Sequence, residues 1–274
     1  MARLIDVINN NKSLSLVYRY LELGFHTIDA NVVQNCLNTF QIDGEILTLE
    51  ALSEFRKYAT EEMANRQYSK RDIAEINNIV TIYGSASISV QSDTIPDNSL
   101  DFDWAVCFFD FAKNIYNHEL QPLWSKIFEL ELRKPKSFFK RTLDVFYRAD
   151  KFEIDWFFEI TKFVFDKACV PEFILTDNRF YQFNKFQTLV DAGFVNASLG
   201  TLSYPEAATI RLVSADMKID ILKPPFGISI YTLTDAGTQI FDLNSECTTD
   251  DYINKFKEVV ENGNRAKVVS IDRK

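Results

Sequence analysis

The segment that decides the fold runs from Glu119 to Asp150 and reads ELQPLWSKIFELELRKPKSFFKRTLDVFYRAD. Its first part carries apolar residues at the three- and four-residue spacing of a helix, namely Leu120, Leu123, Trp124, Ile127 and Phe128. Pro135 disfavours helical backbone at the residue before it, so we expect a break within RKPKS. A second helix should follow, with Ser137 as its N-cap. The segment therefore predicts two amphipathic helices joined by a short basic turn.

Helical patterns continue on both sides of this segment. We expect helices over residues 14–21, 32–40, 49–63 and 69–83, and another from about 101 to 115. Two capping boxes support helix starts, Ser69 with Asp72 and Asp150 with Glu153. Residues 85–100, SASISVQSDTIPDNSL, are small and polar and contain Pro96, so they predict a linker.

The pattern changes after Pro171. A helical run near residues 183–190 is followed by alternating stretches at 209–213, 217–222 and 227–231, and Thr234 can cap a short closing helix. This order is typical of a winged-helix unit. We predict a mainly α fold, with an N-terminal helical region (1–84), a linker (85–100), a central helical core (101–170) and a winged-helix-like α+β domain (171–274).

Composition narrows the class of protein. The 274 residues are 46% apolar and carry a net charge of −9, which opposes general coating of nucleic acid. The 24 phenylalanines indicate bulky helix packing. The four cysteines form no C-x-x-C pair, and neither a secretory signal nor a membrane span is recognisable, so we expect a reducing, cytoplasmic location.

Several motifs in order resemble a bacterial family catalogued as a domain of unknown function, which is distantly similar to the abortive-infection alpha proteins of phage defence. The matching positions in the first motif are Glu119, Leu123, Trp124, Lys126, Ile127, Glu131, Pro135, Ser137, Phe138, Arg141, Thr142 and Leu143. DFDWAVCFFDFAKNI (101–115) also fits, as do FQTLVDAGFVN (186–196) and YTLTDAGTQIF (231–241). The resemblance covers roughly residues 70–245. It implies a cytoplasmic helical protein of antiviral defence and supplies no catalytic residues.

The strongest candidate site is basic. Residues 133–151 hold seven basic and two acidic side chains, a local charge of +5 (seven minus two) in an acidic chain. Free N–H groups at a helix start near Ser137, with cations beside them, would bind a phosphate or carboxylate. The candidate anion- or nucleic-acid-binding residues are Arg133, Lys134, Lys136, Ser137, Lys140 and Arg141. The alternative is a solvated face in which Arg141 pairs with Glu131.

A winged helix could also read DNA through the helix at residues 181–190. That helix offers only Lys185, with Arg179 just before it, and residues 173–246 hold five basic and eight acidic side chains. DNA readers carry a basic face. A protein-contact or structural role is therefore favoured for this unit.

Catalytic chemistry has little support. His26 and His118 are the only histidines, too few for a common zinc site or a triad, and no phosphate-binding glycine loop is present. Asp103 and Asp110 would share a helix face, where caps and solvated charges explain them as well as a metal does. We therefore expect no catalytic residues, metal or cofactor.

The function expected from these observations is that of a non-enzymatic interaction or sensor protein of anti-phage defence with a protein partner. Two alternatives stay open, a nucleic-acid-associated regulator and an effector toxin, and the sequence also allows a homo-oligomer.

Overall fold

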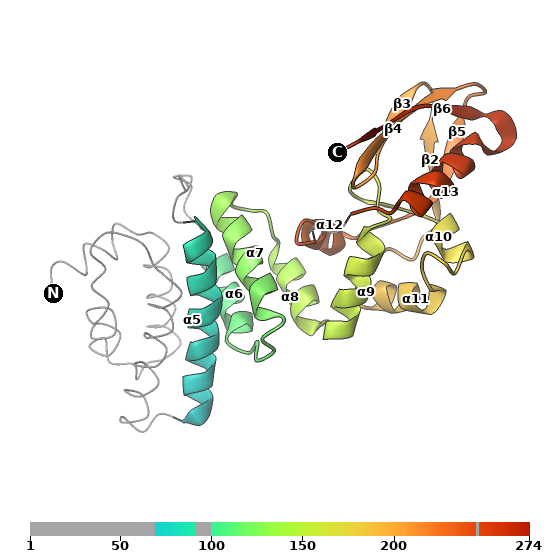
Figure 1. The fold of residues 1–274 in the computed structure, drawn as a ribbon. Coiled ribbons are helices and arrows are strands. Elements are labelled where there is room, and N and C mark those ends of the chain that lie inside the picture. The colour runs from blue at the N-terminus through green and yellow to red at the C-terminus, as the bar shows by residue number, and fades with distance from the viewer. Residues whose placement is uncertain (1–68, 91–99, 245–246) are drawn as a thin grey trace. The chain divides into compact units, whose positions relative to one another are not determined.

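The computed structural model describes residues 69–90, 100–244 and 247–274, and the chain divides into two compact units between Leu143 and Asp144 (Figure 1). The helices predicted over residues 14–21, 32–40 and 49–63, together with His26, lie outside the described residues. About 50% of the described structure is helix and 20% is strand, in two small antiparallel sheets. The predicted mainly α fold class is therefore wrong.

The first unit contains α5 (Lys70–Val90), α6 (Phe102–Ala112), α7 (Gln121–Arg133) and the start of α8 (Lys140–Arg148). Helix α5 packs along α7 and contacts α6. Its start confirms the first capping box, since the Asp72 N–H donates to Ser69 Oγ at 3.1 Å and the Ser69 N–H donates to Asp72 Oδ2 at 3.2 Å. Residues 85–90 of the expected linker belong to this helix, and residues 91–99 are outside the described structure.

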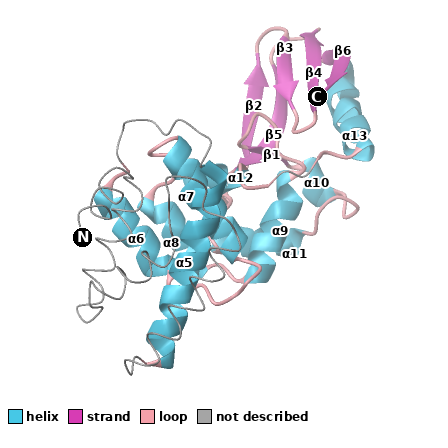
Figure 2. Cartoon of the chain, turned by 60° about the vertical axis from the view of Figure 1, so that its left-hand side comes forward, coloured by secondary structure: helices cyan, strands magenta, loops and turns pink. Residues whose placement is uncertain are grey.

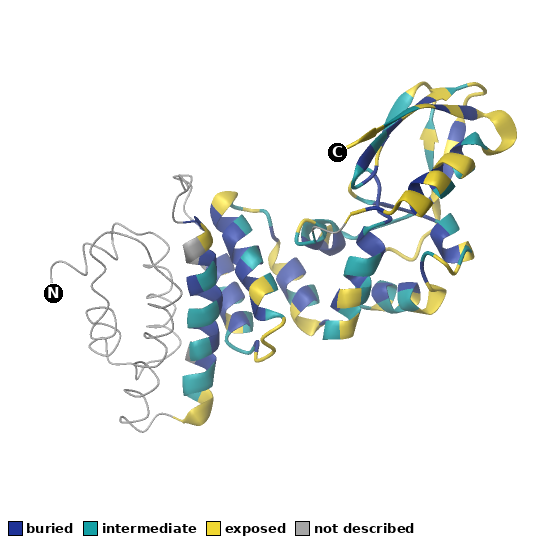
Figure 3. Ribbon diagram, in the orientation of Figure 1, coloured by how far each residue is buried: buried dark blue, intermediate teal, exposed yellow. Residues whose placement is uncertain are grey.

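Aromatic rings fill the core between α6 and α7. Phe108 lies with its ring centroid 5.2 Å from Trp104 and 5.0 Å from Phe128, and Trp124 closes the cluster at 5.5 Å from Phe108. These four side chains are at most 4% exposed. Figure 3 shows the buried faces of α5, α6 and α7. Such offset and tilted rings bury large apolar areas and fix how the helices face one another.

Buried polar groups tie the same three helices together. Gln121 Nε2 donates to Asn78 Oδ1 at 3.0 Å and to the Ile115 carbonyl at 2.9 Å. Asn78 Nδ2 in turn donates to the Lys113 carbonyl at 2.9 Å. Because buried amides are costly when unpaired, this connected network holds α5 and α7 in one register.

The second unit mixes helices with strands. Its helices are α9 (Lys151–Thr161), α10 (Phe173–Thr176), α11 (Phe183–Asp191), α12 (Asp235–Phe241) and α13 (Asp250–Glu261), with a 3-10 turn at Asn262–Asn264. Its strands are β1 (Cys169–Pro171), β2 (Gly200–Tyr204), β3 (Ala208–Arg211), β4 (Ala215–Ile221), β5 (Phe226–Thr232) and β6 (Ala266–Arg273). The second capping box is confirmed at α9, where the Asp150 N–H donates to Glu153 Oε2 at 2.7 Å.

The strands form two three-stranded antiparallel sheets, in the orders β1-β5-β2 and β3-β4-β6 (Figure 2). The winged-helix prediction required the neighbouring stretches 217–222 and 227–231 to lie in one sheet. They separate instead, because β4 pairs with β3 on one edge and with β6 on the other, which leaves no edge for β5. Strand β5 pairs with β1 and β2.

The two D-A-G sequences pack against each other. Gly193 ends α11 with a φ of +85°, and Thr234 caps α12 by accepting from the Gly237 N–H at 3.0 Å. Thr234 Oγ1 also donates to the Gly193 carbonyl at 2.6 Å. A Cβ on Gly237 would lie 2.2 Å from the Phe194 carbonyl oxygen, so the second glycine is required by close backbone contact.

Helix α13 runs alongside β6 (Figure 2). Tyr252 of α13 is fully buried and donates its hydroxyl to the Phe163 carbonyl at 2.6 Å, within an aromatic cluster that includes Phe173 and Phe256. Among the helices in the described ranges, none is long and apolar enough to cross a membrane.

Candidate functional site

The basic turn predicted from the sequence is the loop of residues 134–139, which we call the α7–α8 loop. A buried carboxylate holds it in place. Glu131, only 2% exposed, accepts from the Lys136 N–H at 2.5 Å and from the Phe138 N–H at 3.0 Å. Trp104 Nε1 donates to the Phe138 carbonyl at 2.8 Å. The loop is thus anchored by both the backbone N–H and the backbone carbonyl of Phe138.

The backbone conformation at Lys136 makes this arrangement possible. Lys136 has a φ of +72°, in the left-handed region that non-glycine residues rarely occupy. Successive N–H groups converge on one point when a left-handed residue interrupts the chain, and such a concavity binds anions. The anion bound at this point is the protein's own Glu131. Burial raises the pKa of Glu131, and the backbone N–H groups that it accepts from act in the opposite direction.

The predicted start of the second helix is wrong. Helix α8 begins at Lys140 rather than beside Ser137, and the Ser137 hydroxyl donates back to the Lys134 carbonyl at 2.6 Å. The Arg141–Glu131 ion pair of the alternative, the solvated face, does not form either, because Glu131 lies on the buried face of α7 while Arg141 is exposed. The N–H groups of Lys136 and Phe138, on either side of Ser137, already donate to Glu131.

The candidate cations divide into two groups. Arg133 has a structural role, since its Nε donates to Glu129 Oε1 at 3.1 Å and its Nη2 donates to the Ser89 carbonyl of α5 at 3.0 Å. The other four, which we call the loop cluster, are exposed: Lys134, Lys136, Lys140 and Arg141. Lys140 Nζ lies 4.0 Å from Asp103 Oδ2, and both side chains face solvent. Within the described residues the other three cluster side chains have no ion pair.

Nearby side chains complete this surface. Phe139, in the middle of the cluster, is 52% exposed although it is a large apolar residue. The remaining basic side chains of the segment are paired in the second unit, Arg148 with Asp144 at 2.9 Å and Lys151 with Asp155 at 2.5 Å. The structure thus concentrates unpaired positive charge in a short stretch around one exposed ring.

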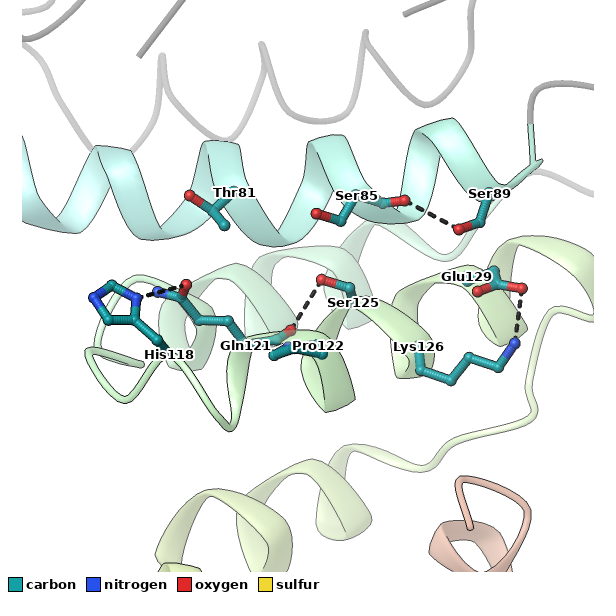
Figure 4. A pocket seen from close by; sticks show the side chains of 9 residues that line it. All are labelled: Thr81, Ser85, Ser89, His118, Gln121, Pro122, Ser125, Lys126 and Glu129. Atoms are coloured by element: carbon teal, nitrogen blue, oxygen red, sulfur yellow. Dashed lines mark hydrogen bonds and ion pairs between the residues drawn. The ribbon is translucent and has the colours of Figure 1, made fainter. Parts of the chain in front are cut away.

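A groove lies between α5 and α7, with a volume of about 380 Å³ (Figure 4). It is lined by Thr81, Ser85, Ser89, His118, Gln121, Pro122, Ser125, Lys126 and Glu129. Ser89 and Ser125 donate their hydroxyls to carbonyls four residues earlier in their own helices. Glu129 accepts from Lys126 at 2.9 Å, as Figure 4 shows. These polar side chains thus form hydrogen bonds or ion pairs within the helices that carry them.

The other residues singled out in the sequence also have local partners. His118 Nδ1 lies 3.3 Å from Gln121 Oε1, and Asp110 pairs with Lys113 at 2.8 Å. In the part of the chain that is described, no group of three His, Cys, Asp or Glu side chains could hold a metal ion.

The helix considered as a possible DNA reader is α11 (Phe183–Asp191). Its only lysine, Lys185, pairs with Glu159 at 2.6 Å and lies 5.4 Å above the Trp156 ring, while Arg179 pairs with Asp177 at 2.6 Å. Both cations therefore form ion pairs within the second unit. Helix α11 therefore offers no unpaired cation for contact with DNA.

Sequence reasoning missed the role of Glu131. A signal was present, because Glu131 continues the apolar stripe of Trp124, Ile127 and Phe128 at helical spacing, where a charged residue must find buried partners. The partners could not be foreseen, because they depend on the left-handed turn at Lys136.

Comparison with known proteins places the loop cluster inside a family match. Residues 61–176 match a family described as "Protein of unknown function (DUF2806)". The match includes the first motif that suggested an uncharacterised family and ends before either D-A-G sequence. No curated protein and no solved structure matches the chain.

Proposed function

We propose that this chain is a non-enzymatic interaction protein that binds an acidic partner protein through the loop cluster. The observation that carries the proposal is the occupation of the loop amides by Glu131. The Glu131 carboxylate anchors the loop backbone from inside. The four cations of the loop cluster remain at the surface, where they can contact an anionic group of a partner. The loop is ordered before binding, which lowers the entropic cost of association.

Charge and shape favour a protein partner. The chain carries a net charge of −9, so the four exposed cations form a local region of opposite charge. This region attracts an acidic surface, while the rest of the chain repels it. Phe139 supplies the aromatic anchor that protein interfaces use at their energetic centres. Nucleic acid would meet the same overall acidity, and the loop cluster is confined to residues 134–141.

The biological setting that we propose is anti-phage defence in the bacterial cytoplasm. It rests on the motif resemblance of residues 101–143 and on no catalytic group having been identified in the sequence. A protein that senses or recruits through contacts fits such a role better than an effector enzyme does.

The binding proposal is tested by charge reversal. The triple variant Lys134→Glu, Lys136→Glu, Arg141→Glu reverses three unpaired cations of the cluster. The control Lys223→Glu, Lys257→Glu, Lys267→Glu makes the same change in net charge at exposed sites of the other unit. Fluorescence anisotropy with an acidic peptide, a DNA and an RNA of similar charge then compares affinities at several salt concentrations.

The expected result is peptide binding that the cluster variant loses and the control keeps. Each exposed pair contributes about 0.5 kcal/mol, and reversal adds a similar repulsion, so three sites change the affinity by roughly 100-fold. Equal binding by both variants would refute the role of the cluster. Tighter binding of either nucleic acid, lost in the cluster variant, would support the nucleic-acid alternative instead.

The defence proposal has its own test. Bacteria with the gene and its neighbours are challenged with a phage panel, in wild-type, cluster-variant and control-variant forms. We expect the wild type and the control to protect and the cluster variant to fail. No protection against any phage by the wild type would contradict the defence role, and protection by all three forms would show that the cluster is not needed for it.

A further inference from the structure

Strand β2 (Gly200–Tyr204) lies at an edge of its sheet. It pairs on one side with β5, from Gly200 opposite Ile230 to Tyr204 opposite Phe226, and no other strand in the described ranges pairs with it. Its residues are exposed or half-buried, and Leu199 just before it is 50% exposed. An edge strand presents backbone N–H and C=O groups that can pair with another chain.

This edge lacks charged side chains, one of the means by which edge strands avoid pairing. No charged residue occurs between Ala192 and Pro205, a run of sequence that contains all of β2. The edge strand β6 of the other sheet, by contrast, carries Lys267, Asp272 and Arg273. Charged side chains on edge strands are a common means of preventing association. The sheet of β1, β5 and β2 has no such charge on its β2 edge.

We infer that β2 pairs with β2 of a second copy of this chain, in antiparallel orientation across a two-fold axis centred on Leu202. The two sheets would then join as one sheet of six strands. In this register Thr201 lies opposite Ser203 of the second copy, and Gly200 lies opposite Tyr204. A two-fold axis requires the strand to complement itself, and these five residues do so without placing two charges together.

The composition of the strand favours a second copy over an unrelated peptide. The two Leu202 side chains, each half-buried in the isolated chain, meet at the axis and cover one another. Thr201 and Ser203, both exposed, form hydroxyl pairs on the other face. The nearest acidic residue beyond the strand, Glu206, falls opposite Ser198, where it meets no like charge. Five paired residues form a small interface, so we expect a reversible dimer.

Two variants test both the contact and its register. Thr201→Lys with Ser203→Lys places lysine opposite lysine twice across the axis, whereas Thr201→Lys with Ser203→Glu places lysine opposite glutamate twice. Both changes lie on exposed positions of the same face. Sedimentation velocity over a concentration series measures the dimer fraction, and circular dichroism confirms the fold of each variant.

We expect a concentration-dependent dimer for the wild type, roughly tenfold or more weakening in the lysine–lysine variant, and a retained dimer in the lysine–glutamate variant. A wild type that stays monomeric, or a lysine–lysine variant as dimeric as the wild type, would overturn the inference. Loss of the dimer in both folded variants would overturn it too, since it would exclude this register.

A measurement on the unaltered chain covers the case in which the variants do not fold. Hydrogen exchange of the β2 amides is compared at low and high protein concentration. Pairing predicts slower exchange of residues 200–204 at high concentration, with β6 unchanged. Exchange of β2 that does not depend on concentration would refute the dimer.

Discussion

Replacing Glu131 with Gln tests how the α7–α8 loop is held. The carboxylate accepts one hydrogen bond on each oxygen, from the N–H groups of Lys136 and Phe138. Glutamine keeps the shape but has one acceptor oxygen, and its NH₂ group would face the second N–H. One buried donor therefore loses its partner, at a cost of about 1–3 kcal/mol.

An opposing effect reduces this cost. Burial raises the pKa of Glu131, so the ionised carboxylate is itself less stable in the folded chain than in water, and glutamine removes that charge. We expect the free energy of unfolding to fall by about 1–2 kcal/mol, in the lower half of the range for an unpaired donor. The left-handed conformation at Lys136 should also lose its main support.

The assay is urea unfolding followed by tryptophan fluorescence, since Trp104 donates directly to the Phe138 carbonyl of the loop. Hydrogen exchange of residues 134–139 reports the loop itself. The matched control is Glu119→Gln, the same change at an exposed position of the same unit, which should shift stability by about 0.5 kcal/mol or less. A Glu131→Gln variant as stable as this control, with unchanged exchange in the loop, would refute the anchoring role of the Glu131 carboxylate.

Three further predictions follow from single contacts. Because the folded pKa of Glu131 is raised, ionising this side chain is less favourable in the folded chain than in the unfolded one. The free energy of unfolding should therefore decline as pH rises from the ordinary glutamate pKa through the raised value, and urea unfolding should show this decline in the wild type and not in Glu131→Gln. Gly237→Ala should destabilise the second unit by about 2 kcal/mol or more, because the new Cβ would lie 2.2 Å from the Phe194 carbonyl oxygen. The control Gly263→Ala has open space around the new Cβ but a φ of +75°, so it should cost only about 1 kcal/mol. Thermal unfolding of the two variants measures this difference in stability. Thr234→Val keeps the side-chain shape but removes the cap of α12 and the hydrogen bond to the Gly193 carbonyl, so the free energy of unfolding should fall by about 1–2 kcal/mol. The control Thr201→Val, at an exposed strand position, should leave the free energy of unfolding nearly unchanged.

Local features were predictable because they depend on neighbours in the sequence. The capping boxes at Ser69 and Asp150 and the cap at Thr234 all form as expected, since each joins groups three residues apart. The break after α7 also follows from Pro135, whose ring restricts the residue before it. Helical spacing of the aromatic residues likewise predicted which face of α7 is buried.

Contacts between distant segments could not be predicted in the same way. Alternation indicated strands at 217–222 and 227–231, but their separation into two sheets depends on β6, which arrives from the end of the chain to occupy the free edge of β4. Strand β2 escaped notice because an exposed edge strand needs no apolar alternation. Pairing partners depend on which segments meet in three dimensions, and side-chain periodicity carries no information about that.

The candidate site shows the same division. The sequence by itself determined that a cluster of cations follows α7, because composition and charge can be read without a fold. Only the tertiary structure decided which of them remain at the surface. Arg133 is held by Glu129 and the Ser89 carbonyl, and the loop amides are held by Glu131, because burial forces polar groups to find partners within the protein before any external ligand is bound.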